Sequence, residues 1–100
     1  MFVNKSGDII DSAYFRSLLF YKDWILKYQI IQDDYSCIVF KIIKISKYVP
    51  THNELNKIKF NVRKIMGNDC KVRFDFKKHI NPLKNGKFLY TINNINNQNA

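Results

Sequence analysis

A lysine directly after an Asn-Gly pair is the residue in this sequence with the clearest potential for chemistry. Lys87 follows Asn85 and Gly86, and apolar residues alternate from Phe88 onward. Asn-Gly between alternating segments is typical of a β-hairpin, because both residues tolerate the positive φ of a type I′ turn. The pattern therefore predicts that Lys87 begins the last strand, at a loop tip from which a charge can reach a ligand. A solvated hairpin lysine without a function is the alternative, because short motifs are weak on their own.

A second lysine, Lys84, lies on the other side of the Asn-Gly pair. We expect Lys87 to be the better positioned of the two, since residues on a regular element are held more firmly than residues in a loop. The prediction is therefore that Lys87 is the functional lysine, that Asn85 and Gly86 support it, and that Lys84 is not functional.

The other reactive residue types form no recognisable site. His52 and His79 lack partners at metal-ligand spacing, so the sequence predicts no metal site. Cys37 and Cys70 have no CxxC spacing and fall in alternating segments, which indicates buried, reduced thiols facing the core. The adjacent acids Asp33-Asp34 are interpreted as turn residues.

Composition indicates one domain over residues 1–100, with 46% apolar residues to form its core. No apolar run approaches the roughly 20 residues that span a bilayer, and the N-terminus lacks a signal-peptide segment, so we expect a cytoplasmic protein. The net charge of +9 is compatible with nucleic acid, an anionic membrane or a phosphate-bearing ligand. The lysines are dispersed, however, and dispersed charge is typical of solvated faces.

The periodicity predicts a short ribbon in the first ten residues and then two helices and four strands. Asp11 or Ser12 is expected to cap the first helix. The tail, residues 93–100, is rich in asparagine and is expected to fray. The helices are expected near 12–21 and 51–66. The main strands are expected near 24–32, 36–46 and 70–77, and the last strand from residue 87, after the hairpin loop.

The second helix has the most complete signals. Thr51 and Glu54 have the spacing of a capping box, and Gly67 is expected to be a left-handed C-cap. One apolar stripe follows at steps of three and four, and it is expected to be buried together with Phe74 and Phe76 of the following strand. The stripe consists of Leu55, Ile58, Val62 and Ile65.

The order of elements predicts an α+β fold. We expect a two-layer sandwich in which two helices cover one face of a mostly antiparallel sheet, with three main strands plus the short ribbon and the hairpin. The helix near 51–66 is expected to form a right-handed crossover between the strands on either side of it.

Four sequence segments, in this order and spacing, resemble the C-terminal domain of the phenylacetate–coenzyme A ligase-like branch of adenylate-forming enzymes. The branch includes CapK-type proteins of capsular polysaccharide biosynthesis. The similarity covers roughly residues 6–95. It is carried by Ser6–Phe15, Trp24-Ile25, Tyr28–Gln32 and the Asn-Gly-Lys-Phe-Leu-Tyr motif at 85–90.

The resemblance implies a small lid domain that closes over a larger N-terminal domain, on the same or a separate polypeptide. That larger domain holds ATP and the carboxylate substrate. Lys87 matches the lysine that enters the site during adenylation. ATP with magnesium and coenzyme A are implied for the full enzyme, and none is expected to bind to this chain alone. The isolated chain is therefore expected to be inactive.

A free-standing basic module is the alternative from a different functional class. A sheet that carries aromatic residues among lysines can stack single-stranded bases, as RNA-recognition sheets do. The rings concerned are Tyr28, Phe40, Phe74 and Tyr90. Both predicted helices need the same apolar face, and no RNP1-like signature is present. Nucleic acid is therefore the less favoured partner, and no membrane partner is predicted.

Overall fold

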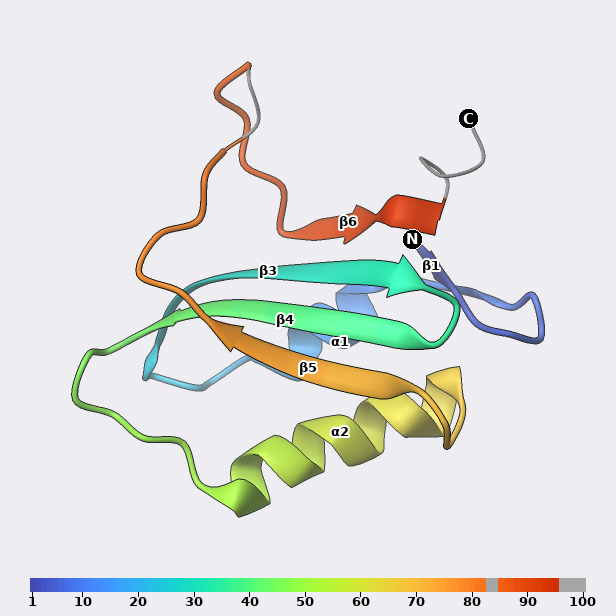
Figure 1. The fold of residues 1–100 in the computed structure, drawn as a ribbon, viewed down its shortest axis with the longest axis horizontal. Helices are drawn as coiled ribbons and strands as arrows, with labels where there is room; N and C mark the ends of the chain where they lie inside the picture. The colour runs from blue at the N-terminus through green and yellow to red at the C-terminus, as the bar shows by residue number, and fades with distance from the viewer. Residues whose placement is uncertain (83–84, 96–100) are drawn as a thin grey trace.

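A computed structural model describes residues 1–82 and 85–95 of the chain (Figure 1). The chain forms two helices, a two-stranded ribbon and a four-stranded sheet, so the predicted α+β class is confirmed. The elements in order are β1 (Phe2–Val3), β2 (Ile9–Ile10), α1 (Ser12–Ser17), β3 (Ile25–Asp34), β4 (Cys37–Lys44), α2 (His52–Met66), β5 (Lys71–Phe76) and β6 (Thr91–Asn93).

The main sheet is mixed and has the strand order β5-β4-β3-β6. β3 and β4 form the predicted long antiparallel hairpin, in which Ile30 faces Phe40. β5 lies parallel to β4, as expected for strands joined by a helix, and β6 lies parallel to β3. The sheet was expected to be mostly antiparallel, but only its central pair, β3 and β4, is antiparallel.

The predicted Asn-Gly hairpin is wrong. β5 and β6 lie at opposite edges of the sheet, so the chain between them must pass both β4 and β3 (Figure 1). A two-residue turn cannot bridge that distance, and a long loop does so instead. Gly86 has a φ of 82°, but Asn85 is outside the positive-φ region that a type I′ turn requires. The last strand therefore begins at Thr91 and not at Lys87.

Helix α2 begins and ends where its sequence signals predict. The Thr51 side chain accepts a hydrogen bond from the Glu54 backbone N–H, and the Glu54 side chain accepts one from the Thr51 N–H. Both halves of the capping box are therefore present. Gly67 ends the helix at φ 114° and ψ 151°. This conformation is not the expected left-handed one, although its positive φ still favours glycine.

Helix α1 is shorter than predicted. The side chain of Asp11 caps it by accepting a hydrogen bond from the Ala13 N–H, but the helix ends at Ser17 and not near residue 21. The next residues continue as tight turns, in which the N–H of Leu18 bonds to the carbonyl three residues earlier. Tyr21 then takes a positive φ of 64°, which stops any further helix.

The hydrophobic core lies between the two helices and one face of the sheet. Phe15 of α1 and Val62 of α2 are fully buried in one cluster with strand residues, so both helices cover the same face. The predicted stripe on α2 is displaced by part of a turn: Ile58, Val62 and Met66 are buried, whereas Leu55 and Ile65 are only half-buried. Phe74 packs against the core, but Phe76 is exposed, contrary to prediction.

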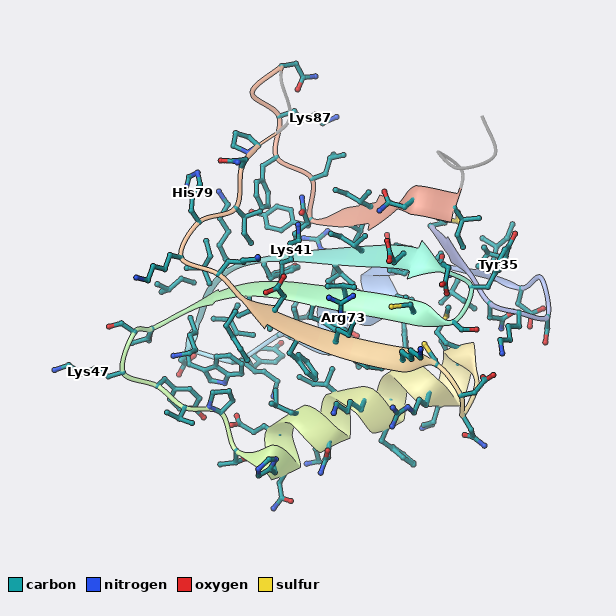
Figure 2. All side chains as sticks on the ribbon, in the orientation of Figure 1. Tyr35, Lys41, Lys47, Arg73, His79 and Lys87 are labelled. Carbon is teal, nitrogen blue, oxygen red and sulfur yellow. The ribbon has the colours of Figure 1, made fainter. Side chains whose placement is uncertain are left out.

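The opposite face of the sheet carries charged side chains, including Lys41 and Arg73, which point toward the viewer in Figure 2.

Of the tail expected to fray, residues 96–100 lie outside the described part of the chain. Residues 93–95 are held: the Asn93 amide donates to the Met1 carbonyl, and Ile95 is buried. In the described residues, no helix is long and apolar enough to cross a membrane.

Candidate functional site

Lys87 lies on the loop that joins β5 to β6, on the part that projects beyond the sheet (Figure 2). Its side chain is exposed. The backbone N–H of Lys87 donates to the Asn85 Oδ1 over 3.0 Å, and Gly86 between them takes a positive φ. The three residues predicted to form the site are therefore brought together in one tight turn, but not in a hairpin.

The charge of the loop favours an anion. Residues 77–90 include four lysines and one histidine and no acidic residue. The Asp75 carboxylate at the end of β5 pairs with Lys77, at 3.2 Å. Lys84 is one of the four lysines and lies outside the described residues. The positive charge at Lys87 is thus presented without a carboxylate from its own loop.

The first arm of the loop is attached to the sheet. The Lys77 N–H donates to the Ile42 carbonyl over 2.8 Å, which extends the pairing of β5 with β4 by one residue. Ile80 is then buried, at 7% exposure. Between this attachment and β6, the chain crosses the sheet in front of β4 and β3 (Figure 1).

The second arm of the loop is attached through its backbone. The buried side-chain amide of Gln29 donates to the Leu89 carbonyl over 3.0 Å. The Ile30 N–H donates to the Tyr90 carbonyl over 2.8 Å, just before β6 pairs with β3. Two hydrogen bonds from β3 therefore fix the chain two and three residues after Lys87.

Three aromatic rings and two cationic side chains pack together at the same arm, which itself contributes the rings of Phe88 and Tyr90. The Tyr90 ring contacts the Tyr28 ring at 5.1 Å between centroids and the Phe88 ring at 5.0 Å. The Arg16 guanidinium lies 5.1 Å from the Tyr90 centroid, and the Lys27 Nζ lies 4.0 Å from the Phe88 centroid. We name these five residues the Tyr90 cluster. Attractions of a cation for a ring face are worth about 0.5–1 kcal/mol at exposed sites.

A hydrogen bond joins the cluster to helix α1. The Arg16 Nε donates to the Tyr28 hydroxyl over 3.0 Å. This bond, with the electrostatic attraction of the Tyr28 oxygen, raises the pKa of the Arg16 guanidinium. Arg16 therefore stays charged and tied to β3 while its guanidinium covers Tyr90.

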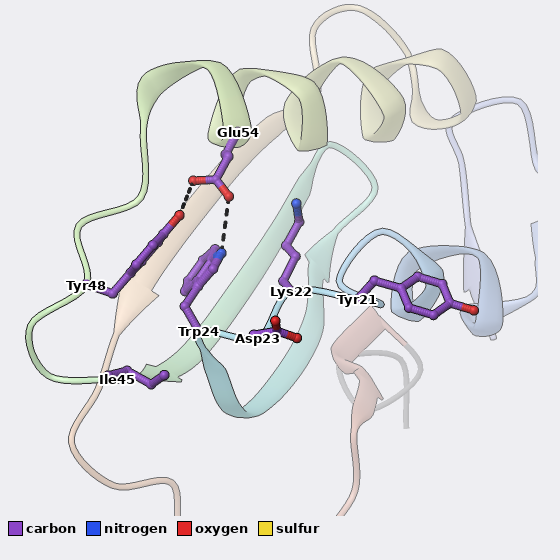
Figure 3. Close-up of a pocket in the computed structure, with 7 residues that line it drawn as sticks. All are labelled: Tyr21, Lys22, Asp23, Trp24, Ile45, Tyr48 and Glu54. Carbon is purple, nitrogen blue, oxygen red and sulfur yellow. Dashed lines mark hydrogen bonds between the residues drawn. The ribbon is translucent and has the colours of Figure 1, made fainter.

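A second candidate site is a hollow of about 390 Å³ beside the start of α2 (Figure 3). The Glu54 carboxylate at its edge accepts hydrogen bonds from the Trp24 Nε1 at 3.2 Å, the Tyr48 hydroxyl at 2.8 Å and the Thr51 N–H at 3.1 Å. The rings of Trp24 and Tyr48 stack on each other at 5.1 Å. The residues that line the hollow are Tyr21, Lys22, Asp23, Trp24, Ile45, Tyr48 and Glu54.

The donors around Glu54 explain its acidity. The Tyr48 hydroxyl and then the Thr51 N–H hold the pKa of Glu54 below its usual value, and the bond to Glu54 raises the pKa of Tyr48. A carboxylate with three donors has little capacity left for a ligand. We therefore interpret Glu54 as a structural residue that joins α2 to the start of β3.

The other sequence candidates lie apart from Lys87. His52 and His79 are exposed, and the described residues hold no group of three or more potential metal ligands. Cys37 and Cys70 are buried free thiols, as predicted. Burial raises the pKa of Cys70 to about 11. The prediction that Asp33 and Asp34 form a turn is wrong, because β3 continues through both residues and the turn is formed by Tyr35 and Ser36. The Asp34 Oδ1 supports this turn by accepting a hydrogen bond from the Ser36 N–H over 2.7 Å.

Of the rings proposed for base stacking, one is fully buried and a second is half-buried. Phe40 is fully buried, and Phe74 packs against the core beneath the helices. Tyr28 and Tyr90 contact each other in the Tyr90 cluster. An RNA-recognition sheet binds bases on a face that no helix covers. In this chain, the face that carries Phe40 and Phe74 is covered by the two helices.

Sequence reasoning missed the residues that hold the Lys87 loop. The Gln29 side chain is polar but buried, at 7% exposure, and a buried amide needs a specific hydrogen-bond partner. The role of Arg16 has no comparable sequence signal. It depends on β6 lying beside β3, a pairing that the local pattern does not indicate.

The comparisons with known proteins agree with this fold. A family model described as the CapK C-terminal domain matches residues 2–94. Among solved structures, the acetoacetyl-CoA synthetase of Streptomyces lividans is similar, with a TM-score of 0.58 at 15% identity. The match covers 88% of this chain and 13% of that chain, so the likeness shows a shared fold over a small part of the larger protein. The comparison with curated proteins finds no match.

Proposed function

The chain belongs to the CapK C-terminal domain family, and on this basis we propose that it is the C-terminal lid domain of an adenylate-forming enzyme, with Lys87 as the residue that it supplies to the reaction. The observation that carries the proposal is the family match over residues 2–94, which includes the Asn-Gly-Lys motif. The exposed, projecting position of Lys87 supports it (Figure 2).

In the adenylation reaction, a positive charge can stabilise the negative charge on the reacting oxygens. A carboxylate oxygen attacks the α-phosphorus of ATP, the bond from that phosphorus to the pyrophosphate oxygen breaks, and acyl-adenylate and pyrophosphate result. Negative charge is redistributed over the oxygens of the carboxylate and the α-phosphate. A lysine ammonium held against these oxygens stabilises the transition state, and electrostatic stabilisation of this kind contributes strongly to enzymatic rate enhancement.

A domain that closes over the reacting groups also protects the product. Water that reaches an acyl-adenylate hydrolyses it, so a lid that excludes water preserves the activated acyl group. In this proposal the basic loop at 77–90 faces the nucleotide, and the partner is an N-terminal nucleotide-binding domain on the same or a separate polypeptide. That domain, with magnesium, holds ATP and the carboxylate.

The finer assignments are also proposals. The resemblance of the sequence to CapK-type proteins of capsular polysaccharide biosynthesis supports a role in that process. The name of the similar synthetase supports coenzyme A as the acceptor of the activated acyl group. The cytoplasm, where ATP and coenzyme A are available, is the compartment proposed for this reaction.

ATP–pyrophosphate exchange tests the proposed function. We expect the purified chain alone to catalyse no exchange with any carboxylate, because it contains three glycines and no glycine-rich phosphate loop. A CapK-type N-terminal domain that is supplied with this chain, fused or in trans, is expected to catalyse exchange faster than that domain alone. Exchange by the isolated chain, or no gain on adding it, would overturn the lid assignment.

A further inference from the structure

The position of Lys87 requires an explanation other than strand pairing. Lys87 lies four residues before β6, in a loop, so no sheet ladder fixes its backbone. Fixing one backbone conformation of a loop residue costs conformational entropy, which other contacts must offset. A misplacement of about 1 Å can cost a catalytic group a hundredfold in rate. The contacts that restrict this loop therefore bear directly on how Lys87 works.

The hydrogen bonds from β3 do not reach Lys87. They hold the carbonyls of Leu89 and Tyr90, which lie beyond Phe88, the residue next to Lys87. Phe88 is held through its ring. One side of the ring meets Tyr90 edge-on at an interplanar angle of 72°, and the Lys27 ammonium lies over the face. The restraint therefore passes to the neighbour of Lys87 through side chains.

Tyr90 is the central member of this arrangement. Its ring contacts Phe88, Tyr28 and the guanidinium of Arg16, so it connects the loop to both β3 and α1. Arg16 in turn is bonded to the Tyr28 hydroxyl. None of the three ring contacts depends on the hydroxyl of Tyr90. Tyr90 and Arg16 are far apart in the sequence, and only the fold brings them together.

We propose that the Tyr90 cluster is the positioning device for Lys87: Arg16, Tyr28 and Lys27 hold the rings of Tyr90 and Phe88, and these rings fix the backbone from which the lysine ammonium projects. This inference rests on the proposed function of Lys87. It assigns the cluster no contact with the reacting atoms. Its members act through Lys87.

Backbone order in the full 100-residue chain is the first test, and it needs no activity. In the wild type, the 15N order parameters of Lys87 and Phe88 are expected to approach the value of about 0.85 of a rigid backbone. Tyr90→Ala is expected to lower them below about 0.6, the range of flexible segments, whereas Tyr90→Phe keeps the ring and the order. Tyr35→Ala is the matched control, because Tyr35 has a similar exposure, 45% against 41% for Tyr90, and lies in the turn that follows β3. Flexible wild-type residues, or no change in Tyr90→Ala, would overturn the inference.

A double-mutant cycle in the complete enzyme is the second test. Tyr90→Ala is expected to lower the kcat of adenylation about 10- to 100-fold with the KM for ATP unchanged, and Tyr90→Phe is expected to restore it. In a Lys87→Ala background, Tyr90→Ala should cost nothing further, because the residue it positions is absent. An equal loss in both backgrounds would mean that Tyr90 acts independently of Lys87, and the inference would fail.

The two tests separate this inference from the proposed function. If Lys87→Ala leaves adenylation unchanged while Tyr90→Ala disorders the loop, the role of Lys87 is wrong and the cluster is a clamp without a catalytic purpose. If Lys87→Ala slows adenylation but the loop stays ordered in Tyr90→Ala, the proposed function stands and the positioning device is wrong. Should Tyr90→Ala fail to fold, Lys27→Ala removes one flanking contact and is expected to lower the order parameter of Phe88.

Discussion

Replacement of Glu54 tests how the start of α2 is joined to the sheet. The carboxylate completes the capping box of α2 and accepts from Trp24 and Tyr48 (Figure 3). Glu54→Ala keeps the Thr51 N-cap but loses the reciprocal hydrogen bond from the Thr51 N–H, which contributes about 1 kcal/mol. The hydrogen bonds to the two side chains contribute about 1 kcal/mol each. Because the three interactions share one group and are not additive, we expect Glu54→Ala to lower the free energy of unfolding by about 2–3 kcal/mol.

Urea denaturation of the wild type and the variants measures this loss. Glu54→Gln keeps one acceptor oxygen and is expected to lose less than Glu54→Ala. Asp23→Asn is the matched control, because Asp23 lines the same hollow but is exposed, and it should change the free energy of unfolding by less than about 0.5 kcal/mol. Equal small effects at Glu54 and Asp23 would refute the reasoning that Glu54 joins these elements.

The pH dependence gives an independent check on Glu54. Its pKa is lowered in the folded chain, so folding favours the ionised form. This contribution is fully present above the ordinary pKa of 4.5 and is lost as the pH falls through the folded pKa. The stability difference between the wild type and Glu54→Gln is therefore expected to be largest near neutral pH and to shrink in acid. A difference that grows in acid would contradict the assigned hydrogen bonds.

Two further predictions concern the core. Ile58→Ala should lower the free energy of unfolding by about 2–5 kcal/mol, because Ile58 is buried at 2% exposure. Phe60→Ala, on the exposed side of α2, should change the free energy of unfolding by less than about 0.5 kcal/mol. Similar losses in the two variants would mean that the buried face of α2 is misassigned. Cys70 has a pKa of about 11 and an exposure of 1%, so its thiol should resist a thiol reagent in the folded chain at pH 8 and react in urea. Rapid labelling of the folded chain would contradict the burial of Cys70.

Local signals predicted the elements that local interactions form. The helix expected at 51–66 was found at His52–Met66, because its capping box and its terminal glycine act within a few residues of sequence. The β3–β4 hairpin was likewise predicted from alternation and a short turn. Helix α1 was overestimated because the helical spacing of Leu18 and Leu19 continues into turns, which present the same residues to the core without an α-helix.

The last part of the chain could not be predicted in the same way. Asn-Gly is a strong hairpin signal only when the flanking strands are neighbours in the sheet, and β5 and β6 lie at opposite edges. The strand order depends on burial across the whole sheet, which a single sequence does not show. The position of Lys87 in the fold was therefore predicted incorrectly. Asn85, Gly86 and Lys87 do lie together in one turn, and their functional role stays a prediction.

The rate of adenylation in Lys87 variants tests the central claim most directly. In a complete enzyme that contains this domain, Lys87→Ala should slow ATP–pyrophosphate exchange about a hundred- to a thousandfold, the loss expected for a positioned group that stabilises transition-state charge. Lys84→Ala, three positions earlier on the same basic loop, should slow it less than about tenfold, as expected of a screened charge without contact to the reacting atoms. Equal effects of the two substitutions, or no effect of Lys87→Ala, would contradict the proposed role of Lys87.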